Sequence, residues 1–452
     1  MGGGNAGVRW DAIVLGGGVS GLVAASVLSQ RREGRGDRGS VPSVLVLDDY
    51  PRLGGNHTSV DIGPYTFDIG SFVFSEHTRF LTHFPRMLPL MANQQPGTVS
   101  TARISPALRL ARYPFDLSED LLRPGLVSAA AMIGSALHGR LAHDQNLNAE
   151  SFCRHWVGDR VYRQTGLKHY MTRLLGEDPA QIESDFAHKR LGWIKRNAGA
   201  GAVAGRLIAR LRPRRARQPG AGRLLVRPRA GFEAMYRVAE EDLGARGVTI
   251  RTDAGLTRIE PAPGGGNVVH LADGARHETG CLISTIPLHQ SLPLCGLDLP
   301  GCLPTASLLS LFVSFEGERG FDANTLYNFT HEGRWKRLTM HSDFYGHAGG
   351  RAYFSVEIAL RAPEADPAQM LAEFRDLADR VGIFRGDLRL EGARLTSHAY
   401  PVHLQGASAA TSSAIAQLRS AGVLSFGRQG GFDYQPTATV SAYVAERALS
   451  GR

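Results

Sequence analysis

The sequence predicts an α/β protein: a Rossmann-like dinucleotide-binding domain with an inserted helical lobe and an antiparallel β-sheet substrate domain. Three observations support this prediction. A glycine-rich motif follows a short apolar strand near the start of the chain. Residues from about 115 to 220 follow a helical pattern and contain no clear strand. Residues 305–360 alternate apolar and polar side chains, as in an antiparallel sheet with one solvated face.

The N-terminal strand, turn and helix predict a dinucleotide-binding unit. We expect residues 11–15 to form a buried strand and residues 21–30 to form the helix after it. Between them, Gly16, Gly18 and Gly21 satisfy the pattern G-x-G-x-x-G. The first two glycines let backbone N–H groups approach a pyrophosphate at the helix N-terminus, and the third lets the helix pack closely on its strand.

The second strand, SVLVLDD, leads into an acidic residue and a second glycine loop. Asp48 lies 27 residues after Gly21, and its carboxylate suits the hydroxyl groups of a ribose. The following stretch, PRLGGNHT, contains Arg52 and the pair Gly54 and Gly55, which suit a phosphate approached closely by bare backbone. These preferences belong to the two ends of one adenosine diphosphate, so the stretch indicates a dinucleotide.

The later elements complete the predicted architecture. GFEAMYRVAEEDLGARG, DPAQMLAEFRDLADRVG and TVSAYVAERALS are expected to be helices, and CLISTIPL and AGVLSFG are expected to be strands. We predict that the dinucleotide-binding domain is assembled from residues 1–112, 223–300 and 396–452. The helical lobe then occupies residues 113–222, and the antiparallel sheet domain occupies residues 301–395.

Composition limits the class of protein. A chain of 452 residues is long enough for two or three domains. Its four cysteines show no metal-binding spacing, which favours reduced thiols in a cytoplasmic protein with no metal site. No signal peptide and no uninterrupted apolar run of about 18 residues are apparent, so we expect no transmembrane span. The oligomeric state is left open.

Arginine dominates the basic residues. Only four of the 51 basic residues are lysines, and the formal net charge is +9. The excess reflects either the codon composition of the genome or a polyanionic substrate, because guanidinium groups bind phosphate in bidentate fashion. Nucleic acid is not expected, since no nucleic-acid-binding module accompanies the charge. Nine arginines between Arg206 and Arg229 indicate a solvated loop, a lid over an anionic substrate or a peripheral contact with a membrane surface.

The N-terminal motifs resemble the FAD-binding signature of the flavin amine oxidase superfamily, which includes protoporphyrinogen oxidases, carotenoid desaturases and UDP-galactopyranose mutases. DAIVLGGGVSGL, the acidic residue after the second strand, and RLGGNHT carry this resemblance. It implies that the cofactor is FAD. The implied cofactor-binding residues in this part of the chain are Gly16, Gly18, Gly21, Asp48, Arg52, Gly54, Gly55, Asn56 and Thr58.

Within that superfamily, the rest of the chain is most similar to UDP-galactopyranose mutase-like flavoproteins. LGEDPAQIESDFAHKR, NFTHEGRWKRLTMHSDFYG, LTSHAYPV and FGRQGGFDY resemble mutase segments around the active site. The resemblance implies that Arg337 and Arg190 bind the diphosphate of a nucleotide sugar and that Tyr400 hydrogen-bonds the same phosphates. The implied residues of the C-terminal flavin loop are Gly427, Arg428 and Gly430.

The same resemblance implies a reaction. In the mutases, reduced FAD attacks the anomeric carbon of the sugar through N5 while arginines stabilise the leaving diphosphate, and the sugar ring recloses in its other form. Phe72 stands where mutases carry a histidine beside the flavin, and His57 is a candidate to replace it. His57 is otherwise a polar loop residue without a role. The first alternative function is an oxidoreductase of the amine oxidase or protoporphyrinogen oxidase type that oxidises a C–H or C–N bond. A flavoprotein that serves only as a binding partner is the second.

Overall fold

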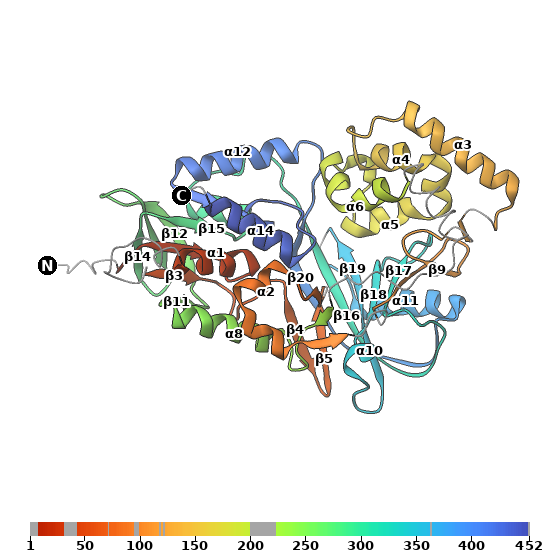
Figure 1. Ribbon diagram of the computed structural model, residues 1–452, viewed down its shortest axis with the longest axis horizontal. Coiled ribbons are helices and arrows are strands. Elements are labelled where there is room, and N and C mark those ends of the chain that lie inside the picture. Colours follow the sequence, from red (N-terminus) through yellow and green to blue (C-terminus); the bar gives the residue numbers. More distant parts are fainter. Residues whose placement is uncertain are drawn as a thin grey trace.

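The computed structural model describes residues 8–30, 43–70, 72–94, 99–116, 119–120, 123–198, 223–361 and 364–450. In Figure 1, a parallel sheet with its helices forms the left half of the molecule, a larger sheet follows to its right, and a helical lobe lies at the upper right. Within the described ranges, no helix combines the length and the apolar composition needed to cross a bilayer.

A five-stranded parallel sheet forms the centre of the dinucleotide-binding domain. Its order is β11-β3-β2-β15-β21, and every neighbouring pair is parallel. Continuous apolar sequences such as AIVL and VLVL form these strands because helices cover both faces of a parallel sheet. The strands are β2 (Ala12–Leu15), β3 (Val44–Leu47), β11 (Val248–Arg251), β15 (Leu282–Ser284) and β21 (Val423–Ser425).

Helix α1 (Val19–Gln30) begins two residues earlier than the predicted helix and packs against strand β3 and helix α14 (Ala438–Leu449). A Cβ atom on Gly21 would overlap the carbonyl oxygen of Gly16, so only glycine allows this approach of helix to strand. The other helices of this domain are α2 (Arg79–His83), the short helix Pro85–Leu90, α8 (Phe232–Ala245), α9 (Leu288–Leu294), α12 (Ala407–Ser420) and α13 (Gly427–Gly430).

Three small sheets flank the parallel sheet. Strands β4 (Thr58–Ile62) and β5 (Tyr65–Ile69) form a hairpin directly after the second glycine loop. A three-stranded sheet consists of β6 (Val73–Ser75), β10 (Leu224–Val226) and β7 (Ala92–Gln94). A four-stranded sheet consists of β1 (Val8–Trp10), β14 (Arg276–Thr279), β13 (Asn267–Leu271) and β12 (Leu256–Pro261).

The large sheet has seven strands in the order β20-β16-β19-β18-β17-β8-β9. Most pairs are antiparallel, as predicted, but β17 and β8 are parallel. The long excursion of the chain through the helical lobe between these two strands permits this parallel pairing. The strands are β8 (Thr101–Ile104), β9 (Leu110–Arg112), β16 (Thr305–Arg319), β17 (Thr325–Asn328), β18 (Arg337–Met340), β19 (Ala352–Leu360) and β20 (Phe384–Pro401).

Three strands of the large sheet lie across the predicted domain limits. Strands β8 and β9 fall within residues 1–112 but belong to the large sheet, and β20 extends six residues beyond 395. Local periodicity does not reveal these assignments, because they depend on which distant strand each segment pairs with. Helix α11 (Pro367–Val381) packs on this sheet around a core that includes Trp335 and Phe374, and the short helix α10 (Ser342–Tyr345) follows β18.

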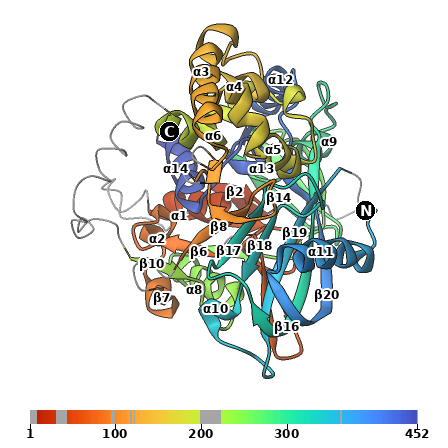
Figure 2. The ribbon, with the colours of Figure 1, turned by 90° about the vertical axis from the view of Figure 1, so that its right-hand side faces the viewer.

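The helical lobe consists of α3 (Leu126–Ala142), α4 (Ala149–Gln164), α5 (Leu167–Leu175), the short helix Pro179–Gln181 and α6 (Ser184–Ala198). Asn148 caps α4 by accepting the backbone N–H of Ser151 at 2.8 Å. Figure 2 shows the lobe above the large sheet. Residues 199–222, which hold six of the nine arginines between Arg206 and Arg229, lie outside the described residues.

Candidate functional site

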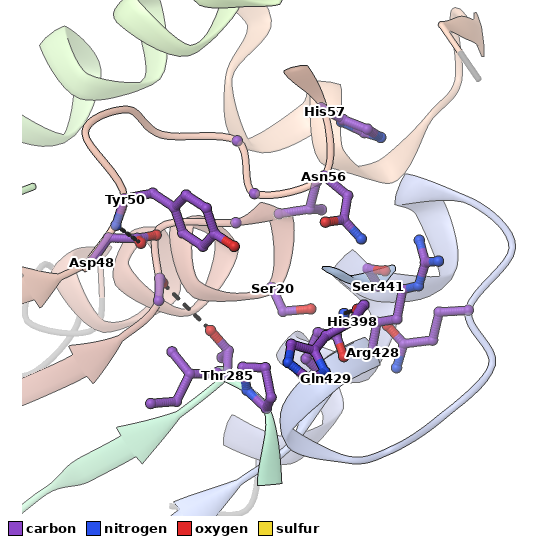
Figure 3. Close-up of a pocket in the computed structure, with 18 of the residues that line it drawn as sticks. Ser20, Asp48, Tyr50, Asn56, His57, Thr285, His398, Arg428, Gln429 and Ser441 are labelled. Atoms are coloured by element: carbon purple, nitrogen blue, oxygen red, sulfur yellow. Dashed lines mark hydrogen bonds between the residues drawn. The ribbon is translucent and has the colours of Figure 1, made fainter. Parts of the chain in front are cut away.

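The glycine loops line a cavity of about 400 Å³ at the carboxyl ends of the parallel strands. Open α/β sheets bind their ligands at this edge. The loops after β2, β3 and β15 contribute to its wall, and α13 and the start of α14 close it from the C-terminal part of the chain (Figure 3). We call this space the first cavity.

The two glycine loops face each other with bare backbone. A Cβ atom on Gly55 would lie 3.4 Å from the Cα atom of Gly18, and one on Gly18 would lie 3.9 Å from the Cα atom of Gly55. Gly54 holds the second loop against the first by donating its N–H to the carbonyl of Gly17 at 2.9 Å. Gly54 and Gly55 have φ values of +111° and +59°, which favour glycine. The loops therefore form a cradle that suits a closely held phosphate group.

Asp48 closes one end of the first cavity. Its Oδ2 accepts the N–H of Gly17 at 2.5 Å. Its Oδ1 accepts the N–H of Tyr50 at 2.9 Å, as Figure 3 shows. Burial raises the pKa of the Asp48 carboxyl, and these two hydrogen bonds partly offset the effect. The side chain is thus fixed by the loop itself, with remaining lone pairs available to a ribose hydroxyl group.

The C-terminal wall of the first cavity holds an unsatisfied acceptor. Gln435 is 4% exposed, and its Oε1 has no hydrogen-bond partner among the described residues. Arg428 and Asn56 both donate to the carbonyl of Ala399, at 2.8 and 3.3 Å. A buried carbonyl oxygen without a hydrogen-bond donor lowers the stability of the fold. The unpaired Oε1 of Gln435 therefore indicates a ligand that donates a hydrogen bond to it.

A second cavity of about 240 Å³ adjoins the first. Both cavities are lined by Asn56, His57, Arg428 and residues 436–438. The other walls of the second cavity come from β5, β6, β16 and β20, and they include Tyr400 and Thr396, whose buried Oγ1 lacks a partner among the described residues. An elongated ligand in the first cavity would therefore reach the boundary between the dinucleotide-binding domain and the large sheet.

His57 lies at the junction of the two cavities. Its Nδ1 is 2.5 Å from the hydroxyl group of Tyr236, and its ring stacks on Phe232 with 5.0 Å between centroids. Burial and the charge of Arg428 lower the pKa of His57 to about 4, so the ring is neutral at neutral pH. Phe72 is 1% exposed, lines neither cavity, and stacks on His341.

Four basic side chains gather where the large sheet meets the helical lobe. Lys336 donates to the hydroxyl group of Tyr400 at 3.0 Å, and its Nζ lies 3.4 Å from Glu357 Oε2. Arg337 pairs with the same carboxylate. Arg428 lies over the ring of the same Tyr400, with its guanidinium carbon 5.0 Å from the ring centroid. We call Arg190, Lys336, Arg337 and Arg428 the basic cluster.

Arg190 belongs to this cluster through a set of tyrosines. Its Nη2 donates to the hydroxyl group of Tyr170 at 3.0 Å, and its buried Nε lacks a hydrogen-bond partner within the described chain. Tyr434 lies within electrostatic range of both Arg190 and Arg428. Burial alone would raise the pKa of Glu357, but Arg337 and Lys336 outweigh it and lower that pKa. The ionised carboxylate of Glu357 thus pairs with two of the four cations, and the basic cluster keeps a net positive charge.

The structure brings most of the predicted residues together. The predicted residues that line the first cavity are Gly16, Gly18, Asp48, Gly54, Gly55, Asn56, His57 and Arg428. Gly21, Thr58, Gly427 and Gly430 shape the wall from behind: the Thr58 hydroxyl group donates to the carbonyl of Gly55, and Cβ atoms on the glycines would meet neighbouring elements. Tyr400 lines the second cavity, whereas Arg190 and Arg337 line neither cavity.

Arg52 lies away from the phosphate position predicted for it. Its guanidinium pairs with Glu233 in the first turn of α8, its side chain is 41% exposed, and it lines neither cavity. The physical reason is the ion pair with Glu233, because no sequence pattern near Arg52 predicts that an acidic side chain lies opposite it. Conversely, the sequence reasoning missed Gln435, Lys336 and Tyr236. Of these three, only Lys336 could have been found from the sequence, because it is one of four lysines in the chain and it precedes Arg337.

Comparisons with known proteins agree with this geometry. Residues 14–88 match a family model described as an NAD(P)-binding Rossmann-like domain. A search of curated proteins gives no significant match. Among solved structures, reduced UDP-galactopyranose mutase is 16% identical and has a TM-score of 0.74, with 98% of this chain and 94% of that chain covered.

Two further structures show the same fold. A proposed protoporphyrinogen oxidase from Exiguobacterium sp. 255-15 is 16% identical, with a TM-score of 0.71 and 99% of each chain covered. Putrescine oxidase bound to putrescine is 14% identical, with a TM-score of 0.61 and 98% and 99% of the two chains covered. These likenesses confirm the predicted Rossmann-like α/β fold.

Proposed function

We propose that this chain is a FAD-dependent enzyme that rearranges a nucleotide-activated sugar in polysaccharide or glycoconjugate biosynthesis. One observation carries the proposal: the glycine-lined first cavity leads through a shared wall into the second cavity, and the second cavity ends at Tyr400, which the basic cluster surrounds. A cofactor site and a site for an anionic substrate are therefore adjacent.

The residues of the first cavity fit FAD. Gly18 and Gly55 line the first cavity with bare backbone that suits a closely held pyrophosphate, and Asp48 offers a fixed acceptor to the ribose. Gln435 offers the unsatisfied acceptor described above, and Arg428 adds a positive charge at the entrance to the second cavity. When bound, FAD supplies a ring that acts as a nucleophile or takes up hydride.

The charge of the basic cluster favours one substrate class over another. Arg190, Lys336 and Arg337 lie at the lobe side of Tyr400, and Glu357 is the carboxylate that pairs with two of them. Such a site stabilises negative charge that develops on a leaving diphosphate. A protonated amine such as putrescine would meet like charge there. The cluster therefore supports a nucleotide diphosphate sugar over an amine.

Anaerobic flavin spectroscopy tests this proposal. The purified protein should be yellow or take up FAD, and after dithionite reduction it should convert UDP-galactopyranose without consuming oxygen. Arg337→Ala should weaken binding of uridine diphosphate at least about 10-fold, because the basic cluster around Tyr400 loses a positive charge. Arg334→Ala is the matched control: Arg334 is exposed, pairs with Glu373, and should leave binding unchanged. A colourless protein that FAD does not load would overturn the proposal.

An oxidoreductase acting on an anionic or neutral substrate is the second candidate. The observation that favours it is the burial of Phe72 against His341, which leaves the cavities without the histidine that mutases carry at this position. An enzyme of this kind should bleach oxidised flavin on addition of substrate without oxygen. A panel of nucleotide sugars, carboxylated tetrapyrroles and amines separates the two candidates in one anaerobic titration.

A further inference from the structure

The two ring nitrogens of His57 have different surroundings. Nδ1 lies 2.5 Å from the hydroxyl group of Tyr236. No described residue hydrogen-bonds to Nε2, and this nitrogen is not among the fully buried atoms without a partner, so it is open to the cavities that the ring lines. A neutral imidazole carries its proton on one nitrogen only, and that choice decides whether His57 offers a ligand a donor or an acceptor.

Tyr236 determines which nitrogen of His57 carries the proton. Tyr236 is 2% exposed, and burial raises the pKa of its hydroxyl group well above the ordinary value, so the phenol keeps its proton. Among the described residues, the hydroxyl group has one hydrogen-bond partner, Nδ1 of His57. A buried O–H group without an acceptor is costly, so the phenol donates to Nδ1. Because the pKa of His57 is about 4, the ring is neutral at neutral pH, and its single proton lies on Nε2.

Aromatic side chains hold the ring of His57 in this orientation. The ring stacks on Phe232 with an angle of 11° between the planes, and Phe74 meets it edge-on with 5.7 Å between centroids. The backbone N–H of Phe232 donates to the hydroxyl group of Ser59 in β4 at 3.0 Å. That hydroxyl group donates to the carboxylate of Asp68 in β5 at 2.6 Å. The hairpin therefore fixes the aromatic platform on which the imidazole lies.

The Nε2–H group lies where an elongated ligand of the first cavity would reach the second cavity. His57 follows Gly55 of the phosphate cradle by two residues and lines both cavities, as Arg428 does. Figure 3 shows both side chains at one end of the first cavity. A donor and a positive charge at one place suit a ligand that presents acceptor atoms there. The isoalloxazine ring of FAD has nitrogen and carbonyl oxygen acceptors, and it gains negative charge on reduction.

We propose that Tyr236 fixes His57 as a hydrogen-bond donor, through Nε2, to an acceptor atom of the isoalloxazine ring. Tyr236 is a positioning residue, and His57 contacts the cofactor. This role differs from that of a general base, because Nε2 already carries a proton. The inference rests on the proposed FAD site, but it does not depend on the substrate being a nucleotide sugar. Negative charge on the ring strengthens the hydrogen bond, so the pair raises the reduction potential of the bound flavin.

The tautomer of His57 can be measured without any cofactor. Long-range proton–nitrogen correlation spectra of the full-length protein, with isotope-labelled histidine, distinguish a protonated ring nitrogen from an unprotonated one. The signals of His57 are those that disappear in His57→Gln. At neutral pH the wild type should show a protonated Nε2 and an unprotonated Nδ1. Tyr236→Phe should show both tautomers, because the phenyl ring donates nothing to Nδ1.

The reduction potential of the FAD-loaded protein tests the contact with the ring. His57→Leu removes the donor and should lower the equilibrium constant for two-electron reduction at least about 10-fold, which corresponds to about 30 mV. Tyr236→Phe should lower the potential less, because part of the population keeps the Nε2–H group. His57→Gln should restore most of the wild-type potential, because its amide also donates. Tyr443→Phe is the matched control: Tyr443 is 52% exposed on α14 and should leave the potential unchanged.

Either of two results would overturn the inference. One is a protonated Nδ1 on His57 in the wild type. The other is an equal reduction potential of the wild type and His57→Leu when both are loaded with FAD. Failure to load FAD would instead overturn the proposed function, and the spectra would still decide which ring nitrogen carries the proton. If His57→Leu does not fold, the potentials of Tyr236→Phe and Tyr443→Phe decide whether the flavin depends on the pair.

Discussion

Gly18 and Gly21 of the N-terminal glycine motif have different structural roles, and substitution of each by alanine should distinguish these roles. A Cβ atom on Gly21 would overlap the carbonyl oxygen of Gly16, whereas one on Gly18 meets only Gly55, at 3.9 Å. Gly18→Ala should keep the stability of the apoprotein within about 1 kcal/mol but weaken FAD binding at least about 10-fold, because the methyl group enters the phosphate cradle. Gly21→Ala should lower the unfolding free energy by about 2 kcal/mol or more. Chemical denaturation and flavin titration of both variants check this prediction.

His57 gives the protein a dependence on pH. Its pKa is about 4 in the folded state and 6.5 in its ordinary environment, so the unfolded chain binds the proton more tightly. Stability is therefore complete above about pH 6.5 and falls as the pH drops toward 4. Between about pH 7 and about pH 4.5, the wild type should lose about 2–3 kcal/mol more unfolding free energy than His57→Gln. Parallel pH profiles of the two proteins would contradict the burial of this ring.

The positions of single residues could be predicted from the sequence where they depend on neighbouring segments of the chain. The glycines and Asp48 could be placed from the sequence because strand, turn and helix are contiguous and their backbone geometry admits few residues. The direction of Arg52 could not, because it depends on Glu233, which is 181 residues away in the sequence. The same holds for Lys336, which meets Tyr400 only because strands β18 and β20 belong to one sheet.

At the scale of elements, helix α3 offers an internal comparison of two glycines. A Cβ atom on Gly139 would collide with backbone of α4, whereas one on Gly134 meets nothing within 4 Å. Gly139→Ala should lower the unfolding free energy by about 1–3 kcal/mol through overpacking. Gly134→Ala should raise it by up to about 1 kcal/mol, because alanine is the better helix former. Thermal melts that rank the two variants in the opposite order would contradict the packing of α3 on α4.

The helices and the parallel strands were predictable elements because their periodicity and caps are local signals. The edge strands β8 and β9 were not, because a segment of three or four residues carries too little pattern to show which sheet it joins. The parallel pairing of β17 with β8 has the same origin: it is decided by the path of the chain through the lobe.

At the scale of the whole molecule, cofactor loading should stabilise the fold. The first cavity is built from segments near both ends of the chain, so a ligand bound there holds distant parts together. Adding FAD at about 100 times its dissociation constant should contribute about 2.7 kcal/mol to the unfolding free energy. Differential scanning fluorimetry should show a higher melting temperature with FAD for the wild type. Asp48→Asn should lose most of the rise, and Asp273→Asn, an exposed ion-paired control, should keep it.

The carbonyl oxygen of Ala399 accepts hydrogen bonds from Asn56 and Arg428, and it thereby ties a loop near the start of the chain to a helix near its end. Because this acceptor belongs to the main chain, exchange of the alanine for another small residue leaves the tie intact. Insertion or deletion of one residue in β20 would instead turn the carbonyl toward the opposite direction. The hydrogen bonds at Ala399 therefore constrain the length of this strand more than they constrain the side chain at that position.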